Sequence, residues 1–209
     1  MKIMKYLYKG FLSIFNYPYI PKEIIKDIKG PLLLHISDTP MVSYNYIFRV
    51  IKILKPQYII HTGDLVDNIK LEIYRNRVEQ YETEVELLIR GLEKNESTKI
   101  FYVLGNHDDY KTVSQLINRG EIIQEGELLS IEECKFVVGH YPKDYSYDVD
   151  FYLYGHSFYP KHHIKNGTTG LNGLLNINVI DLSTKEVFHI NYPIGTDSSR
   201  RMKFNKFGL

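Results

Sequence analysis

The 209-residue sequence contains one cysteine, has almost no net charge and lacks a long apolar segment. The single thiol, Cys134, cannot form an internal disulfide, and its place in the apolar run Cys134–Val138 indicates a buried thiol rather than a nucleophile. A formal net charge of +1 creates no overall field that would attract nucleic acid or an acidic membrane. These absences favour a reducing compartment, and we expect a cytoplasmic protein.

The beginning of the sequence resembles a secretory signal only superficially. Three lysines precede a short apolar run at residues 11–15, which Asn16 and Pro18 interrupt, and no small-residue cleavage site follows. No stretch approaches the roughly 20 apolar residues of a membrane-spanning helix. We therefore expect no transmembrane segment. Residues 1–30 are predicted to form a helical extension that packs on the domain, with contact to a membrane surface as the alternative.

The pattern of apolar residues predicts an α/β protein with one domain over residues 1–209. Apolar composition of 44% and 24% charged residues are typical of a globular domain of this length. Strand-like runs at 32–36, 58–60 and 99–104 alternate with helical patterns at 47–54 and 78–92. After Gly120 the runs become short and no long helix separates them, which predicts a sheet-rich second half.

The C-terminal part of the sequence predicts turns followed by a tail. Asn172-Gly173 and residues 183–185 are typical of hairpin turns, which predicts two or three antiparallel strands within 167–193. The closing residues 195–209 are expected to form a mobile basic tail. Its basic side chains are Arg200, Arg201, Lys203 and Lys206.

Polar side chains follow five of the predicted strands directly. The clearest case is the run of residues 59–68, where apolar residues stop at Gly63 and two carboxylates, Asp64 and Asp67, follow. Taken alone, an aspartate here is better explained as the cap of a helix that begins at Ile69. Carboxylate, amide and imidazole at five strand ends, however, are the ligands of a divalent ion such as Mn, Fe, Ni or Zn. These predicted metal ligands are Asp38, Asp64, Asn106, His140 and His156.

Taken together, these motifs resemble those of the calcineurin-like metallophosphoesterases. The family series is DxH, GDxxD, GNH followed by Asp or Glu, a lone His, and GHxH. Residues 63–67 and 105–108 match in full, and the order and rough spacing match over about residues 32–181. The resemblance implies a four-layer αββα sandwich of two mixed β-sheets between helices, with the metal site at the C-terminal strand ends.

The resemblance also implies two metal ions bridged by Asp64. The second site would use Asp64, Asn106, His140 and His156, all of which are present. The first site would use Asp38 and Asp64 with two histidines, whose positions are held by Pro40 and Phe158. We therefore expect one strongly bound ion, with the second weak or absent. Conceivable replacement ligands are His35 and His61, which strand alternation points to the opposite face, and His162 and His163, which are predicted at the surface.

By the same resemblance, the chain hydrolyses a phosphate mono- or diester with a metal-held hydroxide, and His107 assists departure of the leaving oxygen. Asp64 and His107 are the predicted catalytic residues. Asp67 and Asp108 either orient ligands or cap turns. The missing histidines support an alternative, a weak or inactive scaffold that retains the fold and binds a protein partner. The basic tail suggests a third, weaker possibility, processing of nucleic-acid ends.

Overall fold

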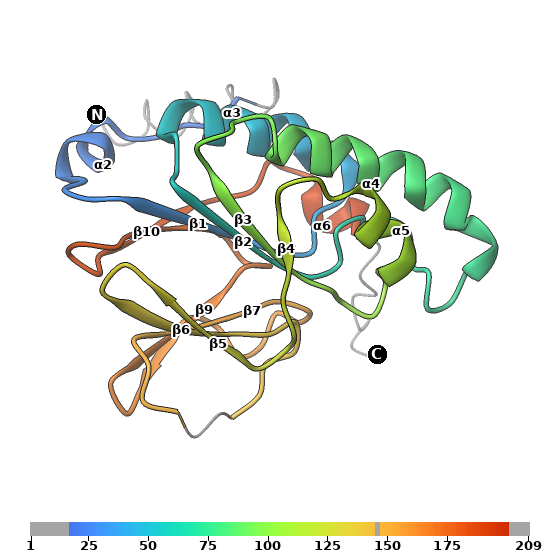
Figure 1. Ribbon diagram of the computed structural model, residues 1–209. Coiled ribbons are helices and arrows are strands. Elements are labelled where there is room, and N and C mark those ends of the chain that lie inside the picture. The colour runs from blue at the N-terminus through green and yellow to red at the C-terminus, as the bar shows by residue number, and fades with distance from the viewer. Residues whose placement is uncertain (1–16, 145–146, 201–209) are drawn as a thin grey trace, which may run out of the picture.

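The computed structural model describes residues 17–144 and 147–200. Its first sheet has the strand order β11-β10-β1-β2-β3-β4, in which β1 to β4 are parallel, β10 is antiparallel to β1, and β11 is antiparallel to β10 (Figure 1). The central strands β1 and β2 are apolar and buried along most of their length, as expected for strands covered on both faces. The strands are β1 (Leu32–Ile36), β2 (Tyr58–Thr62), β3 (Lys99–Val103), β4 (Glu121–Ile122), β10 (Ile177–Asp181) and β11 (Val187–Ile190).

The second sheet has the order β5-β6-β7-β9-β8, and its strands β6, β7 and β9 are parallel. It stacks on the first sheet through an apolar layer to which Leu33 and Ile60 contribute from one side and Phe136 and Leu153 from the other. The chain therefore contains the two mixed sheets that the sequence predicts. The strands are β5 (Glu127–Ile131), β6 (Cys134–Val138), β7 (Phe151–Tyr154), β8 (His163–Lys165) and β9 (Thr168–Asn172).

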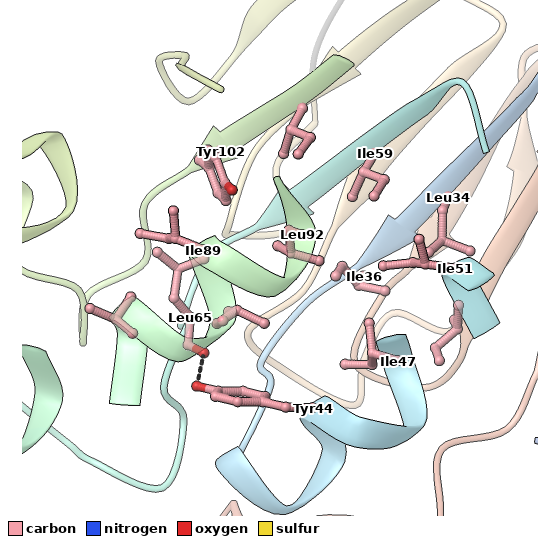
Figure 2. Packing of buried hydrophobic residues seen from close by; sticks show 14 of the residues in the cluster. Leu34, Ile36, Tyr44, Ile47, Ile51, Ile59, Leu65, Ile89, Leu92 and Tyr102 are labelled. Atoms are coloured by element: carbon pink, nitrogen blue, oxygen red, sulfur yellow. Dashed lines mark hydrogen bonds between the residues drawn. The ribbon is translucent and has the colours of Figure 1, made fainter. Parts of the chain in front are cut away.

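Helices cover the outer face of the first sheet (Figure 1). Helix α3 (Tyr44–Leu54) and helix α4 (Val78–Leu92) each bury one apolar stripe against it, and Figure 2 shows Ile47 and Leu92 in this layer. The Tyr44 hydroxyl donates to the carbonyl of Leu65 at 3.0 Å, which ties α3 to the loop after β2. The remaining helical segments are α2 (Lys22–Asp27), η1 (Met41–Ser43), η2 (Arg75–Arg77), α5 (Tyr110–Leu116) and α6 (Thr196–Ser199).

The outer face of the second sheet is covered differently. Val137, Tyr152 and Tyr154 point away from the inter-sheet layer and cluster with Val149 from the preceding loop. Within residues 17–144 and 147–200, loop residues rather than helices lie over this face (Figure 1). The fourth, helical layer of the expected sandwich is therefore replaced by loop in the described residues. Cys134 is buried and its thiol lies 3.3 Å from the carbonyl of Leu182, as expected for a structural thiol.

The structure corrects one of the two predicted hairpin turns. Asn172-Gly173 is not a hairpin turn, because β9 pairs with β7 and β8 while the next strand, β10, joins the other sheet. The turn at residues 183–185 does join antiparallel strands, β10 and β11. The error at Asn172-Gly173 arises because local turn signals do not show which sheet a strand joins.

The two ends of the chain were predicted only in part. Residues 195–200 do not begin a mobile tail, since α6 is ordered and Arg200 is fully buried. Arg201, Lys203 and Lys206 lie outside the described residues, as does the apolar run at 11–15. Helix α2 lies within the helical extension predicted for residues 1–30. None of the described helices has the length and apolar character needed to cross a membrane.

Candidate metal centre and active site

The five predicted ligands lie at the ends of strands that terminate on one side of the two sheets. Strands β1, β2 and β3 are parallel neighbours, so the residues that follow them meet at one sheet edge. Parallel strands β6 and β7 end in the same way in the facing sheet and lead to the two histidines. The structure therefore brings together all five side chains, Asp38, Asp64, Asn106, His140 and His156.

The backbone at these strand ends is unusual and depends on neighbouring glycines. Asp38, Asp64 and His156 have positive φ angles of 51°, 53° and 65°. Left-handed conformations of non-glycine residues cost roughly 1–3 kcal/mol and concentrate at functional sites. A Cβ atom at Gly105 would clash with a carboxylate oxygen of Asp64, and one at Gly155 would clash with a carboxylate oxygen of Asp38. The glycines of the GNH and GH motifs thus provide space for the two aspartates.

Four polar atoms converge around His140. Its Nε2 lies 3.2 Å from Asn106 Oδ1, 3.1 Å from His156 Nδ1 and 3.6 Å from Asp64 Oδ2. The side chain of His140 is completely buried, and those of His156 and Asn106 are partly exposed. The four residues therefore form a pocket of nitrogen and oxygen ligands that is open on one side.

Hydrogen bonds on the far side of two ligands orient them toward this pocket. His140 Nδ1 donates to the carbonyl of Thr62 at 2.7 Å, which leaves the Nε2 lone pair facing inward. The Asn106 amide donates through Nδ2 to Glu72 Oε2 at 2.6 Å, so its Oδ1 also faces inward. Two acceptors therefore face each other with no hydrogen between them. This donor chemistry fits a borderline divalent cation such as Mn²⁺, Fe²⁺ or Zn²⁺.

The positions of the first-site ligands are different. Asp38, Asp64 and Asp67 are at most 2% exposed, and one oxygen of each lies within 4.8 Å of the others. Pro40 is buried without a polar side chain and Phe158 is partly exposed. We call Asp38, Asp64 and Asp67 the carboxylate trio. Among the described residues, the group of possible metal ligands that contains all three of them includes no imidazole. The trio therefore lacks the imidazoles of the first metal site that the family resemblance implies.

The trio places three carboxyl groups in a buried position. Burial raises the pKa of Asp64 well above its ordinary value, and the neighbouring carboxylates raise it further. Burial, together with Asp38, raises the pKa of Asp67 to about 7, although Lys70 and Arg200 act in the opposite direction. Positive charge nearby is therefore needed to keep these two groups ionised at neutral pH.

Two cationic side chains lie beside the trio, and the sequence did not reveal either role. Lys70 Nζ forms an ion pair with Asp67 Oδ1, and its side chain is only 17% exposed. Arg200 is fully buried: its Nε donates to the carbonyl of Asp38 at 2.7 Å, and its Nη1 to that of Leu174 at 2.8 Å. The guanidinium also pairs with Asp197 and lies over the ring of Tyr192.

His107 lies at the rim of the ligand pocket. Its backbone N–H donates to Asp64 Oδ1 at 3.0 Å, and its ring is 8% exposed beside the Asn106 amide. Burial, with a contribution from Lys70, lowers the pKa of His107 to about 4. The ring is therefore neutral at neutral pH before substrate binds, and a neutral imidazole still offers one N–H donor.

Asp108 caps the two loops that carry ligands. One of its oxygens accepts the backbone N–H groups of Asp64 and Gly105, each at 2.8 Å, and the other accepts that of Leu65 at 2.8 Å and the Tyr81 hydroxyl. The sequence left open whether this carboxylate orients a ligand or caps a turn. The contacts show loop capping, which fixes the backbone of Asp64 against that of Gly105.

The histidines considered as replacement ligands make protein contacts instead. His35 Nε2 lies 2.9 Å from Thr62 Oγ1, and His61 Nε2 lies 2.9 Å from Thr39 Oγ1. His61 Nδ1 also accepts the N–H of Gly63, so both of its nitrogens are engaged. His162 and His163 are partly exposed and contact Asn176 and Tyr154 near β8 and β9.

The sequence analysis missed Lys70, Glu72 and Arg200. Lys70 follows Asp67 by three residues, a spacing that allows local pairing and could have drawn attention to it. Glu72 and Asn106 are far apart in the sequence, so nothing local indicated their contact. Arg200 reaches Asp38 across 162 residues, and its basic neighbours made it look like part of a solvated tail.

Comparisons with known proteins identify the family and the fold. The family model for calcineurin-like phosphoesterase matches residues 31–160. A structure of a novel archaeal phosphodiesterase is similar at 15% identity, with a TM-score of 0.51 over 77% of this chain and 99% of that one. YfcE, a phosphoesterase from E. coli, is similar at 15% identity, with a TM-score of 0.53 over 78% of this chain and 99% of that one.

Comparison with curated protein sequences gives no match. At 15% identity the two structures show a common fold, with nearly the whole of each aligned to this chain. The family match covers more than half of the chain and contains the strand ends that carry all five predicted ligands. The chain belongs to the calcineurin-like phosphoesterase family.

Proposed function

We propose that the chain hydrolyses a phosphate mono- or diester with one resident divalent ion, held by Asp64, Asn106, His140 and His156. The observation that carries this proposal is the inward-facing pair of acceptors, His140 Nε2 and Asn106 Oδ1, 3.2 Å apart. Their outward hydrogen bonds to Thr62 and Glu72 hold both in the orientation that ligation needs. The proposed ion is Mn, Fe, Ni or Zn, since the ligand set suits borderline cations.

A divalent ion in this pocket supplies Lewis-acid polarisation of a phosphoryl oxygen and acidifies water. The protein supplies the positioning. Asp108 fixes the loops of Asp64 and Asn106 before substrate arrives, and His107 lies at the open rim with an N–H available for the leaving oxygen. A bound phosphate ester brings negative charge to His107 and raises its pKa, which favours the protonated ring at the time of reaction.

The test uses two phosphodiesters that differ in leaving group, a nitrophenyl ester and an unactivated alkyl ester, with Mn²⁺ present. In His107→Ala we expect hydrolysis of the alkyl ester to fall about 10²- to 10⁴-fold, because a poor leaving group needs a proton. Hydrolysis of the nitrophenyl ester should fall much less. Metal content should not change, since no side-chain atom of His107 belongs to the ligand set. A matched control is His163→Ala, on β8 away from the pocket. Equal losses on both esters would contradict leaving-group assistance.

The scaffold alternative rests on the two missing first-site histidines, whose positions are held by Pro40 and Phe158. A scaffold without activity would have no need of His107 beside the four proposed metal ligands, where the structure places it. Absence of hydrolysis by the wild-type chain with each of the four metals and both ester classes would favour it. The nucleic-acid alternative is weakened because Arg200 is buried and is not available to a ligand. We propose a small phosphate ester as the substrate and the cytoplasm as the compartment.

A further inference from the structure

The carboxylate trio raises a question that the proposed function leaves open. Asp38, Asp64 and Asp67 place three acidic side chains within 4.8 Å of one another in a buried position. A second divalent ion there would have these carboxylates and water as its ligands, because the sequence has Pro40 and Phe158 in place of imidazoles. The open question is which cation balances the charge of the trio when its carboxyl groups ionise.

The structure supplies a cation at this place. Lys70 Nζ contacts Asp67 Oδ1 directly, and the lysine stem is largely buried rather than extended into solvent. Its ammonium is also close enough to act electrostatically on Asp64, His107 and His156, which surround the ligand pocket. The charge of Lys70 therefore affects the pKa of residues at three separate strand ends.

Arg200 adds a second positive charge beside the trio. Its guanidinium is held by the carbonyls of Asp38 and Leu174, and its Nη2 is buried with no hydrogen-bond partner. Its charge acts on Asp67 from a fixed position. A divalent ion placed among the trio would therefore be repelled by two fixed cations, which disfavours its binding.

We propose that the ammonium group of Lys70 replaces the first metal ion, so that the chain functions with one metal ion and one lysine. This inference rests on the proposed function for its catalytic meaning, though not for its test. The ammonium offers three N–H donors and a compact charge, which suits it to contact a phosphoryl oxygen of a substrate held at the neighbouring pocket. Unlike a bound metal ion, the ammonium, which contacts Asp67 directly, cannot be removed by chelators.

The test is a count of bound Mn²⁺ in wild type and Lys70→Met, by equilibrium dialysis at saturating Mn²⁺. We expect one ion per chain in the wild type and two in Lys70→Met, because removal of the ammonium frees the trio for a cation. The second ion should share Asp64 with the first, so electron paramagnetic resonance should show an exchange-coupled pair. Lys70→Arg keeps the charge and should bind one ion.

Two further variants make the count decisive. Lys70→Gln keeps a polar side chain of similar length and should also bind two ions, which covers a failure of Lys70→Met to fold. Lys185→Met removes a lysine from an exposed pair with Asp150 and should bind one. Two ions in the wild type, or no gain in either neutral Lys70 variant, would overturn the proposal. An extra uncoupled ion would do the same, because it would lie away from Asp64.

This count separates the inference from the proposed function. A chain without any hydrolytic activity could still gain one coupled ion when Lys70 is neutralised, which would support the lysine's role and count against the phosphoesterase. Conversely, an active wild type with two bound ions would support the phosphoesterase and reject the lysine's role.

Discussion

The two halves of the metal centre share Asp64 and differ in how their charge is balanced. Around His140, neutral ligands predominate and two acceptors face inward without a donor between them. Around Asp67, carboxylates predominate, and Lys70 and Arg200 already lie against them. Two cationic side chains therefore lie beside the second half, whereas the candidate ligands of the first half face one another. The two halves differ in charge as well as in the number of candidate ligands.

The comparison also separates ligands from supports. Asp38, which the family resemblance assigns to the first ion, accepts the Ser37 hydroxyl at 2.6 Å and the backbone N–H of His156 at 2.9 Å. It therefore holds the strand end that presents His156. In this chain its visible role is to support the neighbouring site, which gives the two halves different sensitivities to mutation.

The largest expected effect comes from removing a ligand of the His140 half. His140→Ala deletes the buried centre of the pocket, so we expect loss of the bound ion and a fall in kcat/KM of about 10³-fold or more. Asp38→Asn should retain the ion, and its kcat/KM should fall about 10- to 100-fold, the range for a residue that orients a ligand. Metal analysis and kinetics on the nitrophenyl diester measure both. Equal metal loss in the two variants would erase the distinction between the halves.

A second expected effect concerns the frame that the His140 half depends on. Asp108→Ala leaves the N–H groups of Asp64, Leu65 and Gly105 without their acceptor, so we expect a loss of about 3–5 kcal/mol in the free energy of unfolding. The adjacent Asp109 is a matched control, because its side chain caps α5 and its removal should cost about 1 kcal/mol. Urea unfolding measures both. Similar costs for the two aspartates would show that water replaces the Asp108 contacts.

The sequence predicts the framework of this protein well because its signals are local. Buried β1 and β2 are apolar runs, and α3 and α4 have regular apolar stripes, so their positions follow from periodicity. The convergence of the five ligand residues follows from parallel strands ending at one edge. The sheet to which β10 belongs could not be predicted, because strand pairing across 145 residues depends on the packing of the whole core.

The parts of the site that the sequence did not reveal depend on long-range contacts. Glu72 orients Asn106 from a loop, and Arg200 reaches Asp38 from α6, and neither has a motif. Pro40 and Phe158 predict that the first site differs from the family pattern, and this stays a prediction. They give no sign of Lys70 beside Asp67, since a missing ligand is visible in a motif and a neighbouring cation is not.

The smallest expected effect concerns His35, which supports the His140 half from beneath. Its ring contacts Thr62, the residue whose carbonyl accepts the His140 N–H. Burial lowers the pKa of His35 well below 6.5, so the folded chain keeps this ring neutral while the unfolded chain protonates it below about pH 6.5. Because the unfolded state then binds more protons, stability falls as pH falls, by up to about 2 kcal/mol for this group between pH 6.5 and 5. His35→Gln should lose that contribution, so the free energy of unfolding in urea should depend less steeply on pH than in the wild type.

Thr62→Val is the control, because it removes the hydrogen bond and keeps the buried imidazole. Its dependence of unfolding free energy on pH should match that of the wild type. If His35→Gln also keeps the wild-type slope, His35 is protonated in the folded state, and the His140 half rests on a charged support like the one beside Asp67.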